Sequence, residues 1–237
     1  DKGMDLKGRN RKQLKKLAQK CRLLLIPVGN PDGFKRFEPE SLKDMEFKDL
    51  RFWGQGSWND GSLCGYPECK LVHPMQKKLT NFLGCYFNDE GINIMHDEFH
   101  DPLAAETKAI IELVKEEGPD MILSLHSHEY PPSIIKTNYI PQNILNCLVN
   151  FTNKYYNKLS KAGLPENGPV FDSGLSNDKF NLVSFLYHIS GAVSAVFENP
   201  HSLKDWCQVS LEETLEIQLK LYQTLMEYAL ERKSGQT

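Results

Sequence analysis

An apolar run that passes directly into two histidines and a carboxylate constrains this chain more than any other stretch. Residues 121–125 read Met-Ile-Leu-Ser-Leu, and His126, Ser127, His128 and Glu129 follow with no intervening glycine or proline. Side chains alternate along a strand, so His126 and His128 are expected on one face at its carboxyl end. In open α/β sheets that edge is where ligands and catalytic groups collect. The stretch therefore predicts a functional site at a strand mouth.

Two other stretches have strand character. Residues 22–28 form a continuous apolar run, which is typical of a strand buried on both faces of a parallel sheet. Residues 190–201 are small and apolar until they reach Glu198. Helical periodicity occupies residues 102–117, 142–162 and 210–232, the last with a Ser/Glu capping box at its start. Strands that alternate with helices indicate an α/β domain.

Composition limits the class of protein without naming a ligand. With 237 residues and 40% hydrophobic content, the chain can bury one large core, so we expect a single domain over residues 1–237. The formal net charge of −3 gives no basic surface that favours nucleic acid or an anionic membrane. No apolar stretch is long enough to span a membrane. The compartment and the oligomeric state are not determined by the sequence.

Residues 35–92 carry little periodicity but several large aromatic side chains, which favours an ordered wall beside a cleft over disorder. Cys64 and Cys69 flank a turn-rich loop within this region. They could close a small disulfide, or they could stay unpaired in a reducing compartment.

Five short segments, in one order, resemble the zinc carboxypeptidases of the carboxypeptidase A type. They are Asn30-Pro31-Asp32-Gly33-Phe34, Gly91-Ile92-Asn93, Ala105-Glu106-Thr107-Lys108-Ala109, Leu123-Ser124-Leu125-His126-Ser127 and Val196-Phe197-Glu198. The resemblance implies a mixed, mostly parallel central sheet with helices on both faces. It also implies Zn²⁺ as cofactor, His126 as a zinc ligand and Glu198 as the general base. Such a metal activates a bound water, and the glutamate takes its proton and passes it to the leaving amine.

The chain departs from the family at the other zinc ligands. They come from a His-x-x-Glu motif ahead of the Asn-Pro-Asp-Gly turn, whereas the first histidine here is His73. We expect the motif upstream of Asp1, in an N-terminal portion that this sequence lacks. The alternative is a relative that has lost the metal.

A second departure concerns substrate binding. Met95-His96 stands where the family has an Asn-Arg pair that grips the substrate carboxylate, and a single histidine is a weaker, pH-dependent clamp. His96, Asn93 and His128 are the candidate substrate-binding residues.

The arginine that stabilises the oxyanion in the family has no obvious counterpart. Arg51 is the candidate for this catalytic role, with Arg36 as second choice and Gln55 as a neutral replacement.

The leading functional hypothesis is zinc-dependent hydrolysis of an amide bond in a peptide or peptide-like substrate. An N-acyl amino acid deacylase of the same superfamily is the nearest alternative. A catalytically inactive relative that binds peptide or cell-wall fragments is the rival from another class. A third possibility is a different fold in which His126, His128 and Glu129 bind a metal by themselves. Side-chain preference and exo- versus endo-cleavage stay open.

Overall fold

The structure is a computed structural model that describes residues 4–5, 9–66, 68–168 and 180–235. Its α-helices are α1 (Lys12–Ala18), α2 (Pro31–Arg36), α3 (Phe47–Gln55), α4 (Ala105–Glu117), α5 (Gln142–Lys161), α6 (Leu182–Ser190) and α7 (Leu211–Lys233). The strands are β1 (Gly56–Trp58), β2 (Thr80–Leu83), β3 (Met121–His128), β4 (Ser133–Lys136) and β5 (Val193–Pro200). Three short 3₁₀ helices are η1 (Glu68–Leu71), η2 (Lys77–Leu79) and η3 (Ile94–His96).

The central sheet has the strand order β3-β5-β4. β3 pairs with β5 in parallel, whereas β4 pairs with β5 antiparallel. The sheet is therefore mixed, and the expected mostly parallel character is not confirmed, because one pairing of each kind is present among the described residues. The chain reverses direction in the few residues between β3 and β4, so β4 runs opposite to β3 and therefore also to β5, which lies between them in the sheet.

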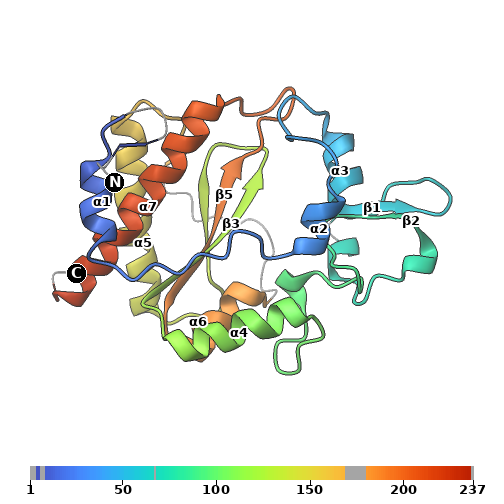
Figure 1. The fold of residues 1–237 in the computed structure, drawn as a ribbon, viewed down its shortest axis with the longest axis horizontal. Helices are drawn as coiled ribbons and strands as arrows, with labels where there is room; N and C mark the ends of the chain where they lie inside the picture. Colours follow the sequence, from blue (N-terminus) through green and yellow to red (C-terminus); the bar gives the residue numbers. More distant parts are fainter. Residues whose placement is uncertain (1–3, 6–8, 67, 169–179, 236–237) are drawn as a thin grey trace.

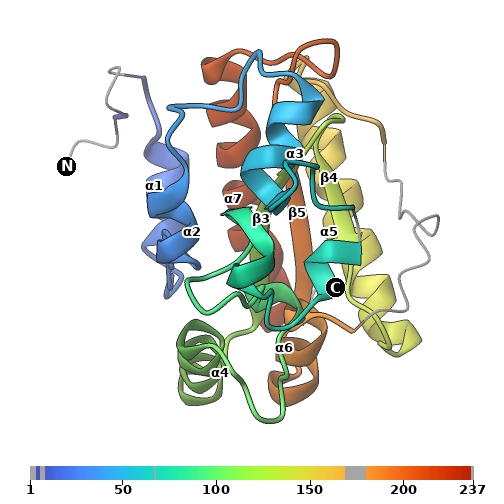
Figure 2. The ribbon, with the colours of Figure 1, turned by 90° about the vertical axis from the view of Figure 1, so that its right-hand side faces the viewer.

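Helices contact both faces of this sheet (Figures 1 and 2). On one face, Leu123, Val193 and Phe197 join a core cluster with side chains of α5 and α7. On the other face, Ile122 packs against a second cluster that includes residues of α4 and α6. The α/β class with helices on both faces thus agrees with the expectation.

Local signals account for the long helices. The side chains of Ser210 and Glu213 form the expected capping box at the start of α7, with Glu213 N donating to Ser210 Oγ at 3.1 Å. α4 begins at Ala105, later than the start at residue 102 that the periodicity predicts. The cause is Asp97, whose carboxylate accepts from the backbone N–H groups of Leu103 and Ala104 at 3.1 and 3.0 Å and holds that segment outside the helix.

The predicted strand over residues 22–28 is wrong, because these residues form neither strand nor helix. Leu25 is 77% exposed and Ile26 is 50% exposed. The segment joins α1 to α2 (Figure 1), and within the described residues no strand pairs with it. An apolar run of this length becomes a strand only where another strand satisfies its backbone groups.

Residues 35–92 contain more regular structure than expected, since α3 leads directly into the antiparallel β1-β2 pair. Phe52, Trp53 and Phe82 pack ring against ring there, with centroids 4.6–5.4 Å apart. The Asn-Pro-Asp-Gly turn docks on this wall: a Cβ at Gly33 would lie 2.1 Å from the carbonyl oxygen of Cys85, so only glycine fits. The aromatic residues are ordered, as predicted.

No helix of the described residues combines the length and the apolar character needed to cross a membrane.

Candidate active site

The register of the two parallel strands brings the main site residues together. His126 on β3 stands directly opposite Glu198 on β5. Both side chains lie on the face of Ile122 and Ser124, because side chains two residues apart share a face. Neighbouring strands lie about 4.8 Å apart, which sets the scale of the separation between the two backbones. The structure thus places His126 beside Glu198 at adjacent strand mouths, as the sequence reasoning required.

Burial disfavours the charged form of both side chains. It lowers the pKa of His126 to about 4, an effect to which the nearby Lys70 ammonium adds. It raises the pKa of Glu198 to about 7, against the opposite influence of Lys70. The Oε2 atom of Glu198 is buried without a hydrogen-bond partner, whereas Nε2 of His126 lies 3.0 Å from Ser124 Oγ. A carboxyl group with such a pKa and an unused oxygen is suited to accept and release a proton near neutral pH.

Lys70 is a site residue that the sequence reasoning missed. It lies on η1, and its Nζ sits 4.6 Å from the ring centroid of Tyr66 and 4.4 Å from that of Tyr86. Burial lowers the pKa of Lys70, while the Glu198 and Glu129 carboxylates act in the opposite direction. The only sequence signal is a lysine among aromatic residues in the long wall region.

His128 is occupied by local contacts. Its Nε2 lies 2.9 Å from the carbonyl oxygen of Pro131, and its ring packs edge-on against Tyr130. His201 follows β5, where burial lowers its pKa to about 4, and its buried Nδ1 has no partner. The contacts with Pro131 and Tyr130 hold the His128 ring within its own loop. A substrate-binding role for His128 therefore stays a prediction.

Asn93 fixes the backbone around the site. Its Oδ1 accepts from Met95 N at 3.1 Å, and its Nδ2 donates to the carbonyl oxygen of Lys70 at 3.4 Å. The Asn93 side chain is therefore engaged on both ends, and the geometry favours a structural role over direct substrate binding. His96 ends η3 and is half-buried; its assignment to substrate binding stays a prediction.

The two arginine candidates for oxyanion stabilisation have other partners. Arg51 Nη2 donates to the carbonyl oxygen of Cys64 at 3.1 Å, which favours a structural role, so its catalytic assignment also stays a prediction. Arg36 donates to the carbonyl oxygens of Gly84 and Phe87 at 3.0 and 2.9 Å. Gln55 is buried with its Oε1 unpartnered. None of these three groups influences the pKa of Glu198, whereas Lys70 does.

Cys64 and Cys69 are free, buried thiols, the second of the two states that the sequence left open. Burial, together with the adjacent Cys69, raises the pKa of Cys64 to about 12. A thiol with this pKa is almost never ionised at neutral pH, and it behaves as a small apolar side chain in the core of the wall.

The described residues do not fit a zinc ion on their own. A catalytic zinc takes three protein ligands. Among the described residues no group of three or more His, Cys, Asp or Glu side chains is arranged to hold a metal. His126 is one imidazole, and its neighbour His128 is bonded to its own loop. The hypothesis that His126, His128 and Glu129 form a metal site by themselves receives no support from this geometry.

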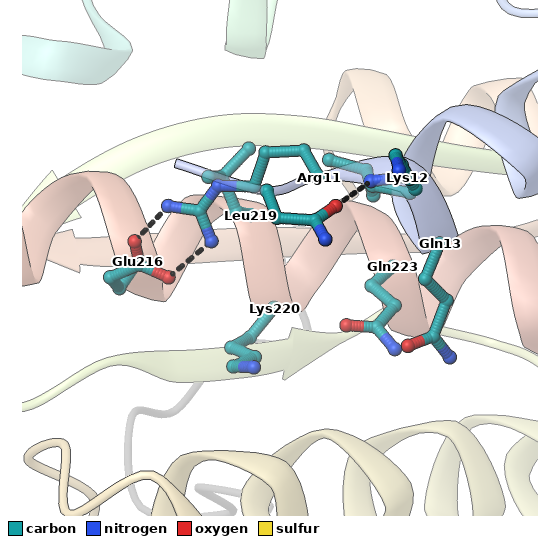
Figure 3. A pocket seen from close by; sticks show the side chains of 9 residues that line it. Arg11, Lys12, Gln13, Glu216, Leu219, Lys220 and Gln223 are labelled. Atoms are coloured by element: carbon teal, nitrogen blue, oxygen red, sulfur yellow. Dashed lines mark hydrogen bonds and ion pairs between the residues drawn. The ribbon is translucent and has the colours of Figure 1, made fainter. Parts of the chain in front are cut away.

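A surface pocket of about 370 Å³ lies elsewhere, between α1 and α7 (Figure 3). Arg11 and Glu216 form an ion pair along its wall, with Gln13, Lys220 and Gln223 beside it. The pocket holds no residue of the His126 and Glu198 pair, so it is not the candidate active site.

Comparison with known proteins gives a family match along most of the chain. A family model for zinc carboxypeptidases matches residues 6–228. No curated protein matches the sequence.

Solved structures resemble parts of the fold. The metallo-carboxypeptidase from Burkholderia cenocepacia is 14% identical, with a TM-score of 0.46, and the match covers 60% of this chain and 39% of that one. The metallo-carboxypeptidase from Pseudomonas aeruginosa, in complex with (2-guanidinoethylmercapto)succinic acid, is 15% identical, with a TM-score of 0.42. That match covers 62% of this chain and 41% of that one. The matches span about two fifths of the length of these relatives.

Proposed function

Because this chain belongs to the zinc carboxypeptidase family, we propose that it hydrolyses an amide bond in a peptide or peptide-like substrate, with Glu198 as the general base. One observation carries the proposal: Glu198 is paired in register with His126, and its buried Oε2 has no hydrogen-bond partner. A buried polar atom without a partner costs free energy, and that cost is understandable where a reacting water or substrate supplies the missing contact.

Glu198 is suited to move a proton twice. In its carboxylate form it accepts a proton from the attacking water, and in its acid form it passes that proton to the leaving amine. A pKa of about 7 populates both forms at neutral pH.

His126 is the ligand that this chain offers to the zinc of its family. Burial holds its imidazole neutral, which is the form that binds a metal. Since the described residues supply no further ligands in place, the remaining donors are proposed to come from outside them.

The test uses protein made from the complete gene and a panel of short peptides with free carboxyl ends. Glu198→Gln is expected to reduce turnover by at least about 100-fold, because it removes the proton acceptor and keeps the shape of the side chain. Glu112→Gln, an exposed carboxylate on α4, is the matched control and should leave turnover unchanged. Zinc content is measured in all three preparations, and the Glu198→Gln variant should hold as much as the wild type.

The second candidate is an inactive relative that binds peptide or cell-wall fragments, and the observation that favours it is the incomplete set of zinc ligands among the described residues. A zinc-free complete protein without turnover, but with measurable peptide binding, would establish this second function and exclude the first. Hydrolysis of N-acyl amino acids, with no action on peptides, would instead establish the deacylase.

A further inference from the structure

Lys70 carries a positive charge that no described residue neutralises directly. Its Nζ lies over the faces of Tyr66 and Tyr86, and in the described part of the chain its ammonium makes no hydrogen bond or ion pair. Ring faces attract a cation, but they do not accept three strong hydrogen bonds. The ammonium therefore retains N–H donors for a ligand.

Electrostatic influences connect Lys70 and its two tyrosines with Glu198. Burial is the main cause that raises the pKa of both Tyr66 and Tyr86. The Glu198 and Glu129 carboxylates raise these pKa values further. Lys70 in turn acts on His126. Because such influences fall off with distance, the cation, its two rings and the strand mouth lie within electrostatic range of one another.

Packing and a hydrogen bond hold the backbone that carries Lys70. The preceding residue, Cys69, is buried in a core cluster with Cys64, Met75 and Phe87. From the other side, Asn93 Nδ2 donates to the carbonyl oxygen of Lys70. This contact links η1 to the segment where Met95-His96 replaces the Asn-Arg pair implied by the family resemblance. A cation is thus fixed next to the place where an arginine is missing.

We propose that Lys70 binds the free carboxylate of the substrate, an inference that rests on the proposed function and names the group that recognises the substrate's end. A desolvated ammonium is best compensated by a ligand that is charged when it binds, and a carboxylate is charged in the ground state. A developing oxyanion is charged only during the reaction. Because lysine is a point charge on a flexible stem and not a rigid fork, it accepts a carboxylate in more than one orientation.

The experiment measures binding by titration calorimetry in Glu198→Gln protein from the complete gene, so that the probe stays intact. The probes are N-acetyl-alanyl-phenylalanine and its C-terminal amide, which differ only in the terminal group, a charged carboxylate in one and a neutral amide in the other. With Lys70 present, the acid should bind more tightly than the amide. Lys70→Met should raise the Kd of the acid about 10- to 100-fold, the range for losing a hydrogen bond to a charged group, and leave the amide unchanged.

Two further variants separate recognition from folding. Lys70→Arg keeps the charge and should restore discrimination between acid and amide to within a few-fold of the parent. Lys48→Met removes an exposed lysine of α3 and should change neither Kd. If the acid and the amide bind equally to protein that has Lys70, or if neither binds, the proposal is overturned. It is also overturned if Lys70→Met weakens both probes alike, the result expected for oxyanion stabilisation or for a structural role.

The outcomes also separate this inference from the proposed function. If binding discriminates between acid and amide only when Lys70 is present, but the wild type hydrolyses nothing, the inference about Lys70 is upheld and the proposed hydrolytic function is excluded. Hydrolysis that depends on Glu198, with binding that is indifferent to Lys70, does the reverse.

Discussion

Two apolar runs in this chain, residues 22–28 and residues 121–125, have similar compositions and different structures. The later run lies within β3 and pairs along its length with β5; Leu123 and Ile122 pack against the core clusters on opposite faces, although Leu125 is 47% exposed. The earlier run pairs with no strand of the described residues and leaves Leu25 77% exposed. The difference shows that apolar content supplies a tendency to be buried, whereas a hydrogen-bonded partner decides whether a strand forms.

The two regions also differ in what attaches them to the rest of the molecule. The sheet is held by apolar side chains such as Phe197, which is fully buried and packs edge-on against Tyr155. The N-terminal region is held largely by charges: Arg9 pairs with Glu212, Arg11 pairs with Glu216, and Arg22 pairs with Glu117 at 2.6 Å. Ion pairs at a surface contribute little each and weaken with salt, so the N-terminal attachment is expected to be the weaker one.

The largest effect on the free energy of unfolding is expected for a substitution in the central sheet. Phe197→Ala should lower the free energy of unfolding by about 3–5 kcal/mol, because it leaves a cavity in a closely packed core. Urea unfolding of the variant and the wild type measures the difference. The matched control is Phe34→Ala, whose ring is 71% exposed on α2 and whose loss should cost less than about 0.5 kcal/mol. Equal costs at the two positions would break the comparison.

A smaller effect is expected where α1 meets α7. The hydrogen bond from Arg11 is the largest influence on Glu216 and lowers the pKa of this carboxyl. A carboxyl group whose pKa is lowered by folding stabilises the folded protein at pH values above its ordinary pKa. This stabilisation is lost as the pH falls through the folded-state pKa. At neutral pH its size should be about 1 kcal/mol or less.

Hydrogen exchange measures this attachment directly. In acid, the amides of α1 should lose protection before those of α5, and Glu216→Gln should make the protection of α1 low and independent of pH in that range. If the variant keeps the acid dependence of the wild type, a different contact holds α1.

The smallest effect is expected in residues 22–28. Leu25→Ala should change the free energy of unfolding by less than about 0.5 kcal/mol, because the side chain is already exposed. The urea midpoint of this variant checks the expectation. A loss above about 2 kcal/mol would mean that Leu25 is buried in solution, and the contrast between the two apolar runs would then disappear.

Local signals explain which elements were predictable. The capping box of Ser210 and Glu213 and the apolar spacing of residues 142–162 act within a few residues, and α7 and α5 formed where these patterns lie. Residues 22–28 failed because a strand depends on a partner far away in sequence. β4 and α6 were missed for a similar reason: a short apolar run does not distinguish a strand from a helix or a loop.

The residues of the candidate site also divide into those that local sequence patterns predicted and those that they did not. Alternation along one strand and the end of another were enough to bring His126 and Glu198 together. Lys70 could not be identified from the sequence, because its surroundings depend on Tyr86 and on Glu198, which is 128 positions later. Arg51 looked equally suitable beside its aromatic neighbours, until the structure placed its guanidinium against the carbonyl oxygen of Cys64.

The pairing register of β3 and β5 has a consequence for how such a site can change. His126 and Glu198 are spaced by the geometry of a hydrogen-bonded ladder, which loop insertions elsewhere leave intact. Lys70 and Tyr66 lie in and just before η1, and Tyr86 lies in the loop after β2; changes in length are tolerated in such connections. Under the two proposals, the chemistry and the choice of substrate are carried by separate parts of the chain, and descendants of this sequence could exchange one substrate for another by altering the wall alone.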